Sequence, residues 1–123
     1  MAITRKKLSG CPIEATISAI SARWKARIVW QLAEAPKTFV SLRAGVEGIS
    51  DRMLTEQLAQ LTADLIIEPD PQSARLYRLS ELGQLLLPVL DAMRRWGEMR
   101  LESGEVDRTT SGRQQSSFGR RAD

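Results

Sequence analysis

The sequence predicts a mainly α-helical fold with a small β-hairpin wing and long terminal helices. Apolar residues recur at helical spacing along most of the chain, and a single stretch, residues 66–79, holds two short β-prone runs around a proline-rich loop. The chain has 123 residues, of which 42% are hydrophobic and 27% charged, as expected of one globular domain with short tails.

The first two predicted helices cover roughly residues 12–21 and 24–34. Pro12 suits the first turn of a helix because its missing N–H has no partner there in any case, and Pro36 ends the second helix. The apolar positions recur at steps of three and four residues along each helix: Ile13, Ile17, Ile20 and Trp24, then Trp24, Ile28 and Leu32.

A short third helix is predicted over 38–46 and a fourth over 50–63, joined by a tight turn. Gly45 weakens the third helix by about 1 kcal/mol relative to alanine, and Thr38 is its candidate cap. Gly48 can supply the positive φ that a tight turn requires, and Ser50 is a good N-cap. The fourth helix has a predicted buried stripe and an opposite face without bulky apolar residues: the stripe is Leu54, Leu58, Leu61 and Leu65, and the opposite face is Arg52, Glu56, Ala59 and Ala63.

The hairpin pairs residues 66–68 with 76–79 around a loop at 69–75. Ser80 then caps a last long helix, which Pro88 should kink. We expect residues 1–10 to form a flexible basic arm, residues 11–103 the domain, and residues 104–123 a disordered tail.

This order of elements is that of a winged helix-turn-helix, with residues 50–63 as the recognition helix in the major groove. The expected base contacts lie in its first two turns, where arginine can read guanine and glutamate can accept from cytosine. They are Ser50, Arg52, Thr55 and Glu56, with Lys25, Arg75 and Arg78 as predicted phosphate contacts. Taken alone, however, residues 50–63 could equally be a solvated amphipathic helix.

The composition disfavours catalysis, and no cofactor or metal is expected. The chain has no histidine, which is the commonest general base and metal ligand, and its one cysteine cannot form a multi-cysteine zinc site. No apolar stretch approaches the roughly 20 residues of a membrane span, so we expect a cytoplasmic protein. The net charge of +3 is compatible with a nucleic-acid partner but does not establish one.

Several motifs, in order and spacing over about residues 11–97, resemble the HxlR-type family of winged-helix regulators. They are CPIEAT at 11–16, RWK at 23–25, Phe39 with Leu42 and Arg43, GIS at 48–50, MLTEQL at 53–58, YRLSELG at 77–83, PVLD at 88–91 and WG at 96–97. The sequence departs from the family pattern at Val40, where a small polar residue is usual, and at Leu65, where glycine is usual. Its wing is also shorter and carries Pro69 and Pro71.

The resemblance implies a homodimeric bacterial transcription regulator that binds operator DNA and dimerises through its first and last helices. The predicted dimer interface consists of Ile13, Ile17, Leu86, Val89, Leu90, Met93 and Trp96. A large apolar surface on a small protein commonly marks such an interface.

The resemblance also suggests an input signal. Cys11 matches a cysteine that senses oxidants or electrophiles in some members, and helix N-termini favour a thiolate; a small packed residue without redox duty is the alternative. Two other readings stay open: a small-molecule effector acting through the dimer helices, and a protein-interaction module in which the altered wing has weakened DNA binding.

Overall fold

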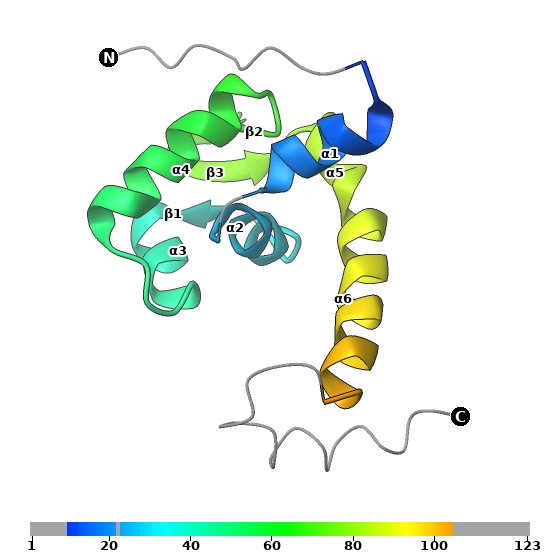
Figure 1. Cartoon of the computed structure of the whole chain (residues 1–123). Helices are drawn as coiled ribbons and strands as arrows, with labels where there is room; N and C mark the ends of the chain where they lie inside the picture. The colour runs from blue at the N-terminus through cyan, green and yellow to red at the C-terminus, as the bar shows by residue number, and fades with distance from the viewer. Residues whose placement is uncertain (1–9, 22, 105–123) are drawn as a thin grey trace. The chain divides into compact units, whose positions relative to one another are not determined.

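The computed structural model describes residues 10–21 and 23–104, so the predicted tail from residue 105 and most of the predicted basic arm lie outside the described residues. The chain divides after Leu87 into two compact units, and the described part of the second unit is most of its last helix. The elements in Figure 1 are α1 (Pro12–Ile20), α2 (Lys25–Leu32), β1 (Lys37–Thr38), α3 (Phe39–Gly45), α4 (Asp51–Ala63), β2 (Ile67–Asp70), β3 (Ser73–Leu79), α5 (Glu81–Gln84) and α6 (Leu86–Glu102).

The helix starts follow the predicted caps. The hydroxyl oxygens of Thr38 and Ser50 accept hydrogen bonds from the backbone N–H groups of Ser41 and Met53, each at 3.1 Å. Each bond satisfies one of the N–H groups that lack a partner in the first turn of a helix. Gly48 has a φ of 88°, as the predicted turn between α3 and α4 requires.

The predicted hairpin is present as the antiparallel pair β2–β3, and β1 adds a third strand to give a sheet of order β1-β3-β2. Strand β1 pairs Lys37 with Tyr77, and it escaped prediction because two residues carry no alternation pattern. The predicted loop at 69–75 was too long, since β2 runs to Asp70 and β3 starts at Ser73. Pro69 fits in β2 because an edge strand does not need every N–H for pairing.

The core of the first unit comes from α2, α3, α4 and the sheet. Three members of the predicted α4 stripe are buried, but Leu65 is 56% exposed. The helix ends at Ala63 and Leu65 has a φ of 65°, so the helical spacing no longer applies there. The fully buried large side chains are Ile28, Val29, Leu42, Val46, Leu54, Leu61 and Ile67.

The predicted last helix is divided into α5 and α6. The break lies at Leu85, one turn before Pro88. Proline lacks the N–H that would bond the carbonyl of Gln84, and its ring crowds that carbonyl. The predicted kink near Pro88 is therefore a division of the helix.

Helix α6 carries an ion-pair network on its own surface. Arg94 contacts both Asp91 at 3.0 Å and Glu98 at 2.8 Å, and Arg95 contacts Asp91 at 2.9 Å. Hydrogen bonds from Arg94 and then Arg95 hold the pKa of Asp91 below its ordinary value. These pairs join residues three and four positions apart, which are neighbours on a helix surface.

Within the described residues, no helix combines the length and apolar character that crossing a bilayer would need. No group of three or more acidic or cysteine side chains in the same part of the chain is placed to hold a metal ion.

Candidate nucleic-acid interface

The first two turns of α4 present an exposed polar face. Ser50, Arg52, Thr55 and Glu56, the four predicted base-contacting residues, are all exposed. The Thr55 hydroxyl donates to the carbonyl of Asp51 at 2.8 Å, which leaves its oxygen able to accept. The side chains of Arg52 and Glu56 make no ion pair or hydrogen bond with other described residues, so their charged groups are available to a ligand.

Arg43 fixes the start of α4, a role that the sequence does not predict. Its Nε donates to the carbonyl of Ile49 at 3.0 Å, and its Nη1 lies 2.6 Å from Oδ1 of Asp51. These two contacts tie the end of α3 to the turn before α4. No spacing rule signals such a pair, because residues 43 and 51 lie on different helices.

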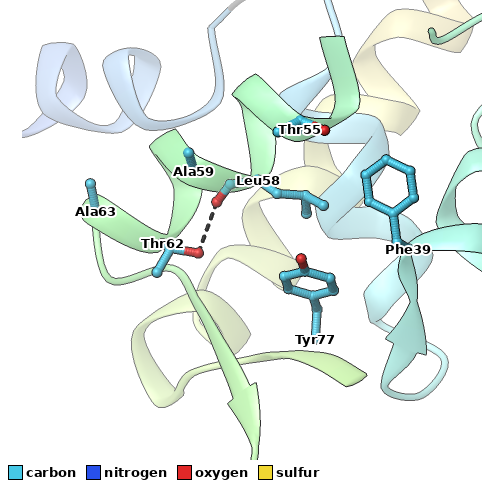
Figure 2. A pocket seen from close by; sticks show the side chains of 7 residues that line it. All are labelled: Phe39, Thr55, Leu58, Ala59, Thr62, Ala63 and Tyr77. Atoms are coloured by element: carbon cyan, nitrogen blue, oxygen red, sulfur yellow. Dashed lines mark hydrogen bonds between the residues drawn. The ribbon is translucent and has the colours of Figure 1, made fainter. Parts of the chain in front are cut away.

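A hollow of about 500 Å³ lies along the side of α4 that carries Thr55 and Ala59. The aromatic rings of Phe39 and Tyr77 lie beneath the helix, close to Leu58 (Figure 2). The Thr62 hydroxyl donates to the carbonyl of Leu58 at 2.8 Å, so it is engaged within the helix. The hollow therefore offers a mostly apolar groove between the recognition helix and β3.

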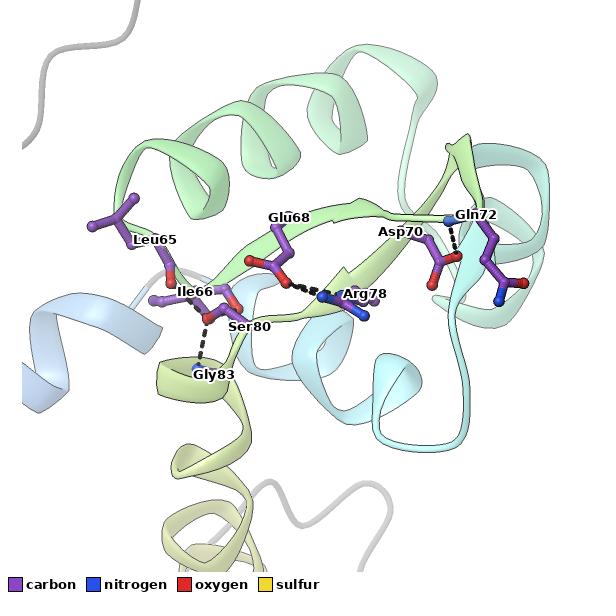
Figure 3. A network of polar contacts seen from close by, with 8 residues as sticks. All are labelled: Leu65, Ile66, Glu68, Asp70, Gln72, Arg78, Ser80 and Gly83. Carbon is purple, nitrogen blue, oxygen red and sulfur yellow. Dashed lines mark hydrogen bonds and ion pairs between the residues drawn. The ribbon is translucent and has the colours of Figure 1, made fainter.

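The two predicted wing arginines differ in their surroundings. Arg75 is exposed near the β2–β3 turn, and its guanidinium has no acidic partner among the described residues. Arg78 donates through Nε and Nη2 to Oε2 of Glu68, at 2.8 and 2.7 Å, across the two strands (Figure 3). Charge-assisted bonds of this kind hold a guanidinium in place, so Arg78 is less available to a phosphate than Arg75.

Lys25 does not occupy the position expected of a phosphate contact. The residue is only 5% exposed at the first position of α2. The burial of Lys25 could not be predicted from the sequence, because lysine is rarely buried in proteins and is therefore expected on the surface.

A polar network holds the exit of α4 (Figure 3). The Ser80 hydroxyl donates toward the carbonyls of Leu65 and Ile66, at 2.7 and 3.0 Å, and accepts from the N–H of Gly83 at 3.0 Å. A Cβ at Gly83 would collide with the carbonyl oxygen of Ile66. This network joins the end of the recognition helix directly to α5.

The predicted dimer residues are mostly exposed in the single chain. In the first unit, Ile13 is 71% exposed and Ile17 is also exposed, whereas Leu86 is half-buried. In the second unit, Val89, Met93 and Trp96 are exposed, and Trp96 reaches 65%. Leu90, by contrast, is only 6% exposed.

Cys11 occupies the N-cap position of α1 and is half-buried. Its side chain makes no capping hydrogen bond to the helix. It is the single cysteine of the sequence, so a disulfide through it must join it to another molecule.

Comparison with known proteins gives a consistent set of relatives. The HTH-type transcriptional regulator YybR of Bacillus subtilis is 35% identical over 94 residues, which span 72% of this chain and 74% of that protein. The HTH-type transcriptional regulator YodB of the same organism is 31% identical over 101 residues, covering 78% of this chain and 90% of that protein.

Solved structures agree with the sequence relatives. The redox regulator HypR in its reduced form superposes with a TM-score of 0.70 at 31% identity, covering 77% of this chain and 98% of HypR. Quinone-bound YodB from B. subtilis gives a TM-score of 0.64 at 31% identity, covering 72% of this chain and 98% of that chain.

The superpositions show that this chain has the same overall fold as these regulators. The family model for the HxlR-like helix-turn-helix matches residues 19–105, which include α2 to α6. The chain therefore belongs to the HxlR-like helix-turn-helix family of transcriptional regulators.

Proposed function

We propose that this regulator acts in the cytoplasm as a homodimer that reads a specific duplex operator, with α4 in the major groove. The observation that carries the proposal is the exposed polar face at the start of α4, where the Arg52 guanidinium and the Glu56 carboxylate bind no other described residue. Arginine can bond the O6 and N7 of guanine together, and glutamate can accept from the N4 of cytosine. Helix-turn-helix proteins use the N-terminal turns of this helix for base contacts.

Arg75 on the wing supplies a phosphate contact in this proposal, and Arg78 a weaker one. Phosphate contacts set the register of the protein on the duplex, while base contacts carry the sequence information. The Glu68 pair holds Arg78, and Lys25 is left out of the proposed surface because of its burial.

The homodimer is proposed from the exposed apolar side chains of α1 and α6. On α6, Met93, Trp96 and Met99 are each at least half exposed, and such groups on a regulator of this size favour a protein partner. A two-fold dimer presents two copies of α4 to half-sites about 10 base pairs apart.

Footprinting on the DNA next to the gene tests the proposal. We expect protection of two half-sites of related sequence, with a centre-to-centre distance of about one helical turn. The affinity should fall with salt in proportion to about 0.9 times the number of phosphates contacted. No protection at low salt, with the protein folded, would contradict DNA binding.

We also propose that oxidants or electrophiles act on this protein through Cys11. The solved relatives include a redox regulator and a quinone-bound regulator, and Cys11 is half-buried at the start of α1. Treatment with diamide should link two chains through Cys11 and change the DNA affinity. The Cys11→Ser variant should bind DNA like the parent without responding to diamide; a full response in that variant would exclude Cys11 as the sensor.

A further inference from the structure

We propose that Arg23 and Arg27, gathered over the Trp24 ring, contact DNA phosphates beside the N-terminal end of the recognition helix. This inference rests on the proposed DNA binding and adds to it a backbone contact that the sequence did not indicate. Three observations carry it: the geometry of the arginines, their lack of acidic partners, and the position of Trp24.

The two guanidinium groups share one aromatic ring. The Arg23 Cζ lies 4.5 Å from the centroid of the Trp24 ring, and the Arg27 Cζ lies 5.7 Å from it. A guanidinium stacked on an aromatic face keeps its N–H donors pointing outward in its own plane. Both arginines are exposed, so these donors remain accessible to a phosphate while the ring restricts the motion of the side chains.

The charges of this pair are not compensated by the described protein. Arg43 and Arg78 each contact a carboxylate within 3 Å, whereas neither Arg23 nor Arg27 forms an ion pair with any residue in 10–21 or 23–104. The two like charges lie 4.5 and 5.7 Å from the centroid of one ring, so they repel each other. A phosphate placed between them would relieve that repulsion.

Trp24 places the pair next to the helix-turn-helix turn. A Cβ built on Gly48 would lie 3.8 Å from Cη2 of Trp24, and Gly48 stands two residues before Ser50, the N-cap of α4. In helix-turn-helix complexes the first helix of the motif crosses the phosphate backbone while the second lies in the groove, so a segment packed against the turn between them lies beside that backbone. The arginine pair therefore lies next to the end of α4 that enters the groove. Along the chain, Arg23 and Arg27 stand on either side of the buried Lys25.

The stacked arginines could instead serve only to cover Trp24, which would be a purely structural role. The two roles differ in their dependence on charge. A phosphate contact needs the positive charge at residues 23 and 27 and is kept by lysine, whereas covering the ring needs the planar guanidinium.

The test measures binding to a 30-base-pair duplex of arbitrary sequence as a function of salt, because phosphate contacts do not require the operator. The variants are Arg23→Gln/Arg27→Gln and Arg23→Lys/Arg27→Lys. The control is Arg94→Gln/Arg95→Gln, which removes the same charge from the surface of α6. Circular dichroism and light scattering establish that each variant keeps the fold and oligomeric state of the parent.

We expect the glutamine pair to reduce the slope of log affinity against log salt by about 2 in magnitude, since each lost phosphate contact removes about 0.9. The lysine pair should keep a slope near that of the parent, and so should the α6 control. Relative affinities among different duplex sequences should not change. An unchanged slope in the glutamine pair, or an equal change in the α6 control, would overturn the inference while leaving the proposed function intact. If the parent itself binds no duplex at low salt, the proposed function and this inference both fail.

Discussion

Leu65 is a leucine in a backbone conformation that favours glycine. It has a φ of 65° directly after α4, its side chain is 56% exposed, and the Ser80 hydroxyl bonds its carbonyl. A leucine in the left-handed region costs about 1–2 kcal/mol, because Cβ approaches the backbone too closely. The resemblance places glycine here in most of the family, and the observed φ gives that preference its physical reason.

Replacing Leu65 with glycine should stabilise the protein. The relief of strain exceeds the extra entropy of glycine in the unfolded chain, so we expect a gain of about 0.5–1 kcal/mol in the free energy of unfolding. Urea denaturation measures it. The control is Leu85→Gly, because Leu85 is also exposed but has a φ of −67°, and it should lose stability. A loss in both variants would mean that the Leu65 side chain makes a stabilising contact.

Arg75 and Arg78 should differ in their contribution to DNA binding. Arg75→Gln removes an uncompensated charge, so we expect the salt slope to fall by about 1. Arg78→Gln should change the slope less, because Glu68 already holds that guanidinium. Fluorescence anisotropy with one duplex at several salt concentrations measures both. A larger effect at Arg78 would show that the Glu68 pair opens on DNA.

The connection from α4 to α5 depends on the close approach of the Gly83 backbone to the carbonyl of Ile66. Gly83→Ala should destabilise the protein by about 1–3 kcal/mol, since the new methyl group would meet the carbonyl of Ile66 and force the two segments apart. Thermal or urea unfolding measures the loss. Gly10→Ala is the control, because no described residue beyond its chain neighbours lies within 4 Å of a Cβ at Gly10. Equal stabilities of the two variants would show that the Ser80 network adjusts without cost.

The sequence predicted those elements whose signals are local. Thr38, Ser50 and Ser80 begin helices as expected because capping depends on a few adjacent residues. Apolar spacing likewise identified Leu54, Leu58 and Leu61 as core. The prediction failed where tertiary context decides: β1 exists only through its pairing with β3.

The candidate site was predictable to a similar degree. The exposed face of α4 follows from its helical periodicity. The burial of Lys25, the engagement of Arg78 by Glu68, and the gathering of Arg23 and Arg27 over Trp24 depend on contacts between side chains. A single sequence does not directly indicate which charged side chains form ion pairs in the folded protein.

At the scale of the whole molecule, the exposed apolar residues of α6 are the basis of the proposed dimer. Trp96→Glu should convert the protein to a monomer, because a charge would be buried without a partner in the interface. Sedimentation velocity measures the mass in solution. Val40→Glu is the control: Val40 is also an exposed apolar residue, on α3, and this variant should keep the oligomeric state of the parent. A Trp96→Glu protein that remains dimeric would exclude α6 as the interface.

Helix α4 is proposed to read bases through its first two turns, and substitution of Arg52 tests this proposal. The measurement compares the parent and Arg52→Ala on the footprinted operator and on duplexes that each carry one base-pair change. We predict a loss of about 1–3 kcal/mol on the operator, with the preference removed at one position of each half-site and kept at the others. An equal loss of affinity on every duplex would show that Arg52 contacts a phosphate. That result would contradict the proposal that α4 reads bases through Arg52.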